Sequence, residues 1–155
     1  MSQFTSPLKL AKTVYTDGQG RHLYRLMRDL EYEIGHEGSG LKIVVPKDRL
    51  TNLATVPRTP LLQWLYRGIA DIEGPYIAAS VLHDYLCNET FTADECDEPA
   101  DRGERSGFSR LEAAAHFWVA MRALRTPLWQ SFTAYVAVRA NDWRLFFLQG
   151  CKFND

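Results

Sequence analysis

The sequence has 155 residues, of which 46% are hydrophobic and 24% are charged, values typical of one globular domain. Lys and Arg number 18 against 19 Asp and Glu, so no overall charge attracts nucleic acid or an anionic membrane. No apolar run approaches the roughly 20 residues that a membrane-spanning helix needs. We therefore expect a single domain over residues 1–155, with no nucleic-acid partner and no transmembrane segment.

The first third of the chain has the pattern of β-strands, because β-branched and aromatic residues recur in short runs between turn residues. The Asp-Gly-Gln-Gly segment at 17–20 is typical of a hairpin turn, and Pro46 ends the last run because proline cannot donate a ladder hydrogen bond. A small antiparallel β-meander is therefore expected in a β-rich part, residues 1–50. Its expected strands cover residues 12–16, 21–26, 30–34 and 41–45.

From Pro57 onward the apolar residues recur with a helical period. Ser109 is followed three residues later by Glu112, a capping-box pattern that marks one helix start. The expected fold is α+β, with a bundle of about four helices in the helical part, residues 57–150. These helices cover about residues 59–66, 76–87, 109–124 and 127–147. Between the second and third, residues 88–107 are rich in Asp, Glu and Arg and are expected to form a solvated loop.

The fourth expected helix is unusually aromatic. It carries Trp129, Phe132, Tyr135 and Val136. Packing in the core is the expected use of these side chains. Contact with a membrane surface or with a partner helix is the alternative.

His83 and Asp84 are adjacent on the second expected helix, which is otherwise almost wholly apolar. Burying a polar side chain without a partner costs about 1–3 kcal/mol, so each must have one. One interpretation is structural: His83 donates to a backbone carbonyl, and Asp84 pairs with Arg58.

The other interpretation is catalytic. His83 would act as general base for a water molecule, with Asp84 as a metal ligand or as an anchor that holds such a ligand in place. Such a base usually has a carboxylate on its far nitrogen, yet the third helix offers Ala114 on its core face and Glu112 on the other. Cys87, one turn beyond His83, suggests zinc as a further alternative. The odd number of cysteines, three, argues against a disulfide framework, and reduced thiols are expected.

The segment between the sheet and the helices, residues 51–58, is rich in side chains that bond to nearby backbone groups. Asn52 and Thr55 make it a candidate for a rigid, self-capped connection. The alternative is a loop that presents backbone carbonyls and Asn52 to a cation.

Four motifs resemble the bacteriophage protein family catalogued as domain of unknown function 1353, over about residues 24–143. The resemblance implies a phage or prophage gene product, and it adds Tyr85 and Arg110 to Asn52, Thr55 and Arg58 as framework or binding residues. The four motifs are residues 51–58, residues 78–86, Ser109-Arg110 with Phe117 and Met121, and residues 135–139.

More distantly, the His-Asp pair is similar to the layout of prokaryotic secretory phospholipases of the A-two type. That resemblance implies a histidine that activates water, an adjacent aspartate that binds calcium, and an orienting acid on the next helix. Here the orienting acid falls on Ala114, and the acid usual in the family's loop motif is Asn52. This member therefore looks degenerate as a catalyst.

These observations lead to one hypothesis and two alternatives. The hypothesis is a phage-encoded structural or accessory protein, a minor component of the virion tail or head, whose partners are other phage structural proteins or further copies of itself. With no secretory signal, it would be made in the host cytoplasm. The first alternative is a calcium- or zinc-dependent hydrolase of host envelope lipid or peptidoglycan, using His83 as general base. The second is a regulatory binder of a host protein through residues 88–107.

Overall fold

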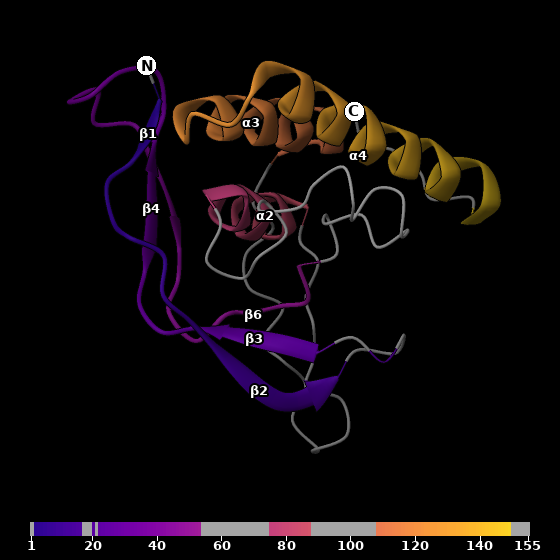
Figure 1. Ribbon diagram of the computed structural model, residues 1–155, viewed down its shortest axis with the longest axis horizontal. Helices are drawn as coiled ribbons and strands as arrows, with labels where there is room; N and C mark the ends of the chain where they lie inside the picture. The colour runs from indigo at the N-terminus through magenta and orange to yellow at the C-terminus, as the bar shows by residue number, and fades with distance from the viewer. Residues whose placement is uncertain (1, 17–19, 21, 54–74, 88–107, 150–155) are drawn as a thin grey trace.

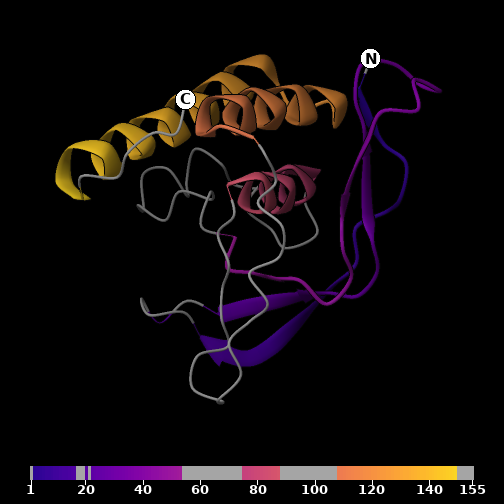
Figure 2. The same ribbon diagram turned by 180° about the vertical axis from the view of Figure 1, so that it is seen from behind.

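The computed structural model describes residues 2–16, 20, 22–53, 75–87 and 108–149, with side chains described as far as residue 140. In Figure 1 the helices α3 (Arg110–Ala123) and α4 (Leu128–Gln149) form one layer, and α2 (Pro75–Leu86) lies beneath them. The strands lie to one side of α2 and below it, as the opposite view in Figure 2 also shows.

Six strands are described, and they form two three-stranded antiparallel sheets, in the orders β1-β4-β5 and β2-β3-β6. The expected strands are confirmed, but the single meander is wrong. The chain changes sheets after β3, so that β4 pairs with β1 and β5 instead of with β3. The strands are β1 (Gln3–Phe4), β2 (Leu10–Thr16), β3 (His22–Leu26), β4 (Leu30–Glu33), β5 (Lys42–Val45) and β6 (Leu50–Thr51).

The crossing between the sheets depends on local hydrogen bonds. Asp29 accepts a bond from the backbone N–H of Lys47 at 2.7 Å, which ties the turn after β3 to the turn after β5. Asp48 has a φ of 66° in the second of these turns, and its N–H donates to the carbonyl of Leu26. β1 and β6 have two residues each, too few to show an alternating pattern, so the sequence did not indicate them.

Three helices are present among the described residues, and they do not form the expected four-helix bundle. The helix expected at residues 59–66 lies outside the described part of the chain. α3 packs between α2 and α4, while α2 also contacts β5 and α3 contacts β1. Strands therefore cover surfaces of α2 and α3 that a further helix would cover in a four-helix bundle.

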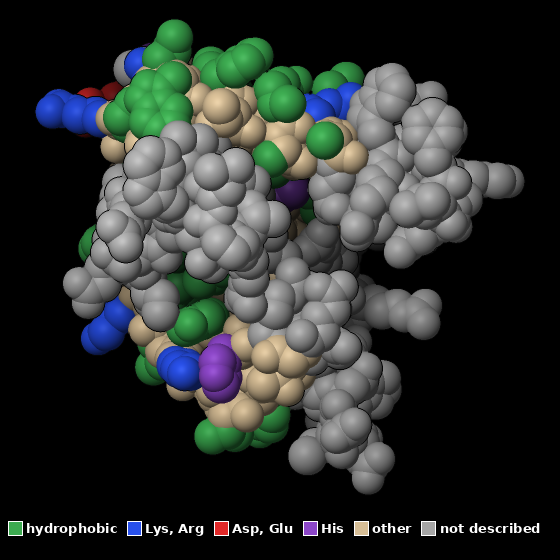
Figure 3. Space-filling model, turned by 45° about the vertical axis from the view of Figure 1, so that its right-hand side comes forward, with side chains coloured by type: hydrophobic (Ala, Val, Ile, Leu, Met, Phe, Trp, Pro, Cys, Tyr) green, Lys and Arg blue, Asp and Glu red, His purple; other side chains and the backbone are tan. Residues whose placement is uncertain are grey.

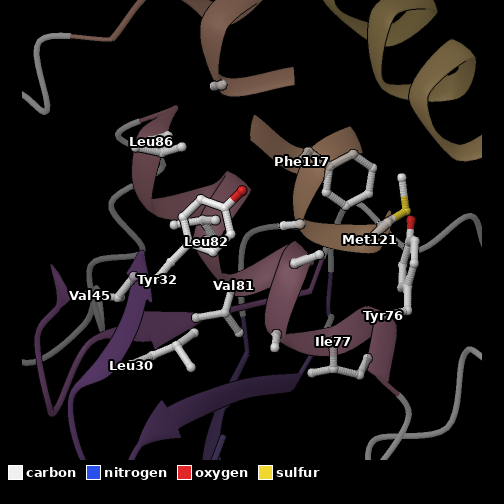
Figure 4. Packing of buried hydrophobic residues seen from close by; sticks show 14 of the residues in the cluster. Leu30, Tyr32, Val45, Tyr76, Ile77, Val81, Leu82, Leu86, Phe117 and Met121 are labelled. Atoms are coloured by element: carbon white, nitrogen blue, oxygen red, sulfur yellow. The ribbon is translucent and has the colours of Figure 1, made fainter. Parts of the chain in front are cut away.

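One cluster of buried apolar side chains joins the strands to all three helices. Leu30, Tyr32 and Val45 extend from the first sheet toward α2 (Figure 4). On the far side of α2, the rings of Tyr76 and Phe117 meet edge to face at 5.5 Å. No helix in the described residues has the length and apolar character required to cross a membrane.

Candidate functional site

His83 and Asp84 lie in a buried polar cluster between α2 and the end of β6. Their residues are only 5% and 3% exposed. Thr51, at the end of β6, donates a hydrogen bond from Oγ1 to Asp84 Oδ2 at 2.6 Å. Asp84 Oδ1 is 3.9 Å from His83 Nδ1, an ion-pair separation too long for a direct hydrogen bond. Asp84 therefore connects the histidine on its own helix to a strand 33 positions earlier.

The chain turns sharply at this carboxylate. The hydroxyl of Thr51 also accepts a hydrogen bond from the backbone N–H of Leu53 at 3.2 Å. Leu53 has a φ of 53°, in the left-handed region that side chains rarely adopt. Asn52, between them, is fully buried. The bond from Leu53 to Thr51 is of the kind that a self-capped connection requires. The rest of the segment, with Thr55 and Arg58, lies outside the described residues, so the self-capped connection stays a prediction.

Cys87 and Phe117 contact the imidazole of His83. Cys87 Sγ lies 3.4 Å from His83 Nε2, and the Phe117 ring from α3 packs against the imidazole at 5.3 Å between centroids. Burial alone would lower the pKa of His83, but interactions with Asp84 and Cys87 outweigh it and raise this pKa from 6.5 to about 10. His83 is therefore protonated at neutral pH, which is unfavourable for a general base that must accept a proton from water.

The face of α3 that packs against the core carries no carboxylate. Its buried residues are Ala113, Ala114, Phe117, Ala120 and Met121, all with no exposed surface. The remaining acid, Glu112, is exposed and closes the capping box with Ser109 through bonds of 2.8 and 3.2 Å. α3 thus supplies no acid to orient His83, as the position of Ala114 had indicated.

The remaining predictions concern a metal site and the residues Tyr85 and Arg110. Among the described residues, no group of three or more His, Cys, Asp or Glu side chains is arranged to hold a metal ion. Tyr85 is half-buried, and the Arg49 guanidinium lies over its ring at 5.1 Å, a contact that sequence reasoning missed. Burial lowers the pKa of Arg49, although Tyr85 and Asp84 oppose the shift. Arg110 is the first residue of α3.

The exposed surface of α4 is a second candidate site. The expectation of core packing is wrong for Trp129, Phe132 and Val136, whereas Tyr135 is half-buried against the core. Leu128, Trp129, Phe132 and Val136 are each between 46% and 64% exposed. The side chains that α4 buries are instead mostly small or polar, with one valine, and hydrophobic side chains gather over this layer in Figure 3. These buried residues are Gln130, Ser131, Ala134 and Val138.

The apolar surface of α4 continues onto α3. The ring of Trp118 meets those of Phe132 and Tyr135 at 6.3 and 6.0 Å between centroids. No charged residue occurs anywhere in residues 126–138. An exposed apolar patch of this kind marks a binding surface more often than a free one. We call Leu128, Trp129, Phe132 and Val136 the α4 face.

Comparison with known proteins places the chain in one family. The model of the family described as "Protein of unknown function (DUF1353)" matches residues 24–138. The chain belongs to this family. It is also 29% identical over 133 residues to the "Uncharacterized protein y4jT" of Sinorhizobium fredii (strain NBRC 101917 / NGR234). That match covers 84% of this chain and 33% of the relative, so the chain spans about a third of the relative's length. No solved structure matches.

Proposed function

We propose that this chain is a structural or accessory protein of a bacteriophage, a minor component of the tail or head, that assembles with further copies of itself through the α4 face. The observation that carries the assembly role is the orientation of α4, which leaves large apolar side chains such as Trp129 and Phe132 exposed. The phage origin rests on the motif resemblance of residues 51–58, 78–86 and 135–139.

A second copy is the partner that the chemistry of the α4 face favours. Two copies related by a two-fold axis bring the same patch together, so any charge in it would meet a like charge. Residues 126–138 contain none, and this contact therefore carries no repulsion. Burying Phe132 and its neighbours would stabilise the contact by about 25 cal/mol for each Å² of apolar surface removed from water.

The buried polar cluster fits a framework role in such a protein. Asp84 links α2 to the end of β6 through Thr51, and it balances the charge of His83. The bond from Thr51 holds α2 on the sheet β2-β3-β6. Asn52, which is fully buried, follows Thr51 directly in this link between β6 and α2.

Analytical ultracentrifugation over a range of concentrations tests the assembly. We expect the wild-type chain to sediment as a dimer or larger species, and the double variant Phe132→Ser, Val136→Ser to sediment as a monomer with a similar melting temperature. Val14→Ser is the matched control, since Val14 is 90% exposed on β2, away from α4. A wild-type chain that is monomeric at every concentration contradicts the assembly. So does a double variant that still assembles, and so does an α4 face that instead binds lipid vesicles.

The location in the particle has its own test. Mass spectrometry of purified virions from a phage or induced prophage encoding this chain should detect it at low copy number. The chain should be found in the host cytoplasm before assembly. Its absence from virions, with the chain present in the infected cell, contradicts the virion role.

The alternative proposal is a calcium- or zinc-dependent hydrolase of envelope lipid or peptidoglycan. The adjacency of His83 and Asp84 on one helix supports it. It is the weaker proposal, because His83 is protonated at neutral pH and one oxygen of Asp84 already accepts a bond from Thr51. It predicts turnover of a lipid or peptidoglycan panel with calcium or zinc added, abolished by His83→Ala in a folded protein. Turnover of this kind would favour the hydrolase over the framework role.

A further inference from the structure

A thiol and an imidazole lie together at the C-terminal end of α2. Residues four apart share one face of a helix, and Cys87 Sγ is accordingly 3.4 Å from His83 Nε2 and 4.0 Å from Nδ1. Cys87 is half-buried and has no disulfide partner among the described residues. Neither the assembly through α4 nor the link from Asp84 to β6 uses this thiol.

The side chains around the pair hold the imidazole in place. The carboxylate of Asp84 lies 3.9 Å from His83 Nδ1, on the helix position next to the imidazole. Its other oxygen is held by Thr51, so the carboxylate is fixed in place. Phe117 packs against the imidazole and limits its rotation. A thiol, an imidazole and a carboxylate in contact in this order are the components of cysteine nucleophiles.

We propose that Cys87 is a nucleophilic thiol that accepts an acyl group from an ester or thioester, with His83 holding the thiol proton and Asp84 balancing the charge. The sulfur attacks the carbonyl carbon, a new S–C bond forms, and the bond from that carbon to the leaving oxygen or sulfur breaks. The proton on His83 passes to the leaving group. The products are acylated Cys87, an alcohol or thiol, and neutral His83.

The contact requires one adjustment before it can react. Because Sγ is nearly as close to Nδ1 as to Nε2, the thiol lies beside the ring instead of in line with one N–H bond. Hydrogen bonds of reacting groups are often longer before the substrate binds.

The test uses p-nitrophenyl acetate at neutral pH, on the full chain with Cys96 and Cys151 replaced by serine. Intact-mass and peptide mass spectrometry should locate one acetyl group on Cys87. The folded protein should react about tenfold faster than the same protein unfolded in urea, since an activated thiol loses its advantage on unfolding. A folded protein that reacts at the unfolded rate, or more slowly, overturns the proposal. Cys87→Ser is the blank.

A second variant shows whether the reaction rate of Cys87 depends on His83 or only on the exposure of the thiol. His83→Gln should lower the rate of the folded protein about tenfold, with a larger loss for an alkyl thioester, whose leaving group needs the proton more. An unchanged rate in folded His83→Gln overturns the proposal. If that variant does not fold, the comparison of the folded with the unfolded protein that retains His83 still tests the proposal. The double variant Phe132→Ser, Val136→Ser should keep the acylation rate, so this proposal and the assembly can fail separately.

Discussion

At the scale of single residues, the structure of the polar cluster depends on one buried carboxylate. Asp84 accepts a hydrogen bond from Thr51 and faces the imidazole of His83, and both contacts are shielded from water. Removing one partner from a buried charged pair usually destabilises a protein by about 3–5 kcal/mol, because the other charge stays buried alone.

Asp84→Asn should therefore lower the free energy of unfolding by about 3 kcal/mol or more. The amide keeps the shape of the side chain but removes the buried carboxylate beside the protonated His83. Urea denaturation at neutral pH measures this difference. Thr51→Ser is the control, since it keeps the hydroxyl that donates to Asp84, and it should cost less. An Asp84→Asn protein as stable as wild type contradicts the framework role.

The protonation of His83 makes a second prediction. Its pKa is about 10 in the folded state against 6.5 for an unperturbed histidine, so the folded state binds this proton more tightly. Its contribution to stability is complete below pH 6.5 and is lost as the pH rises toward 10. The stability difference between wild type and His83→Gln should shrink across that range when measured by urea denaturation. A difference that grows with pH would contradict the charged state.

At the scale of elements, the start of α3 is set by residues that are close together in the sequence. Ser109 and Glu112 make the capping box that their spacing predicts. Ser109→Ala should lower stability by about 1 kcal/mol, because the Glu112 N–H and the Ser109 cap lose their bonds. Thermal unfolding followed by circular dichroism measures the loss. Ser109→Asp, another good N-cap residue, should be nearly neutral, and equal losses in both variants would contradict the cap.

The orientation of α4 is an element-scale property that the sequence did not settle. Large apolar side chains occur on several sides of this helix, so its pattern does not show which side meets α3. Ser131 and Ala134 lie on the packed side because small side chains let two helices approach closely. Phe132 and Val136 then face outward.

At the scale of the whole molecule, one apolar cluster joins strands and helices. Phe117 is at its centre, in contact with Tyr76 and with the ring of His83. A single domain over residues 1–155 predicts one cooperative unfolding transition. Phe117→Ala should lower stability by about 3–5 kcal/mol. Far-ultraviolet circular dichroism and tryptophan fluorescence should report the same midpoint, and two separate midpoints would contradict a single domain.

The sequence by itself determined the local features of this protein. Four strands, the capped start of α3 and the buried α2 follow from alternation, spacing and composition, since these depend on residues near one another in the chain. The sequence alone also showed that position 114 carries no acid, because the apolar stripe of α3 identifies the face of this helix that meets the core.

Only the tertiary structure decided which distant residues meet. The division into two sheets depends on β1 and β6, which are too short to leave a pattern. The bond from Thr51 to Asp84 and the ring contact between His83 and Phe117 join separate elements. The outward side of α4 likewise depends on what α3 presents to it. Which residues meet depends on packing and desolvation over the whole chain. A pattern within a short stretch of sequence therefore cannot predict these contacts.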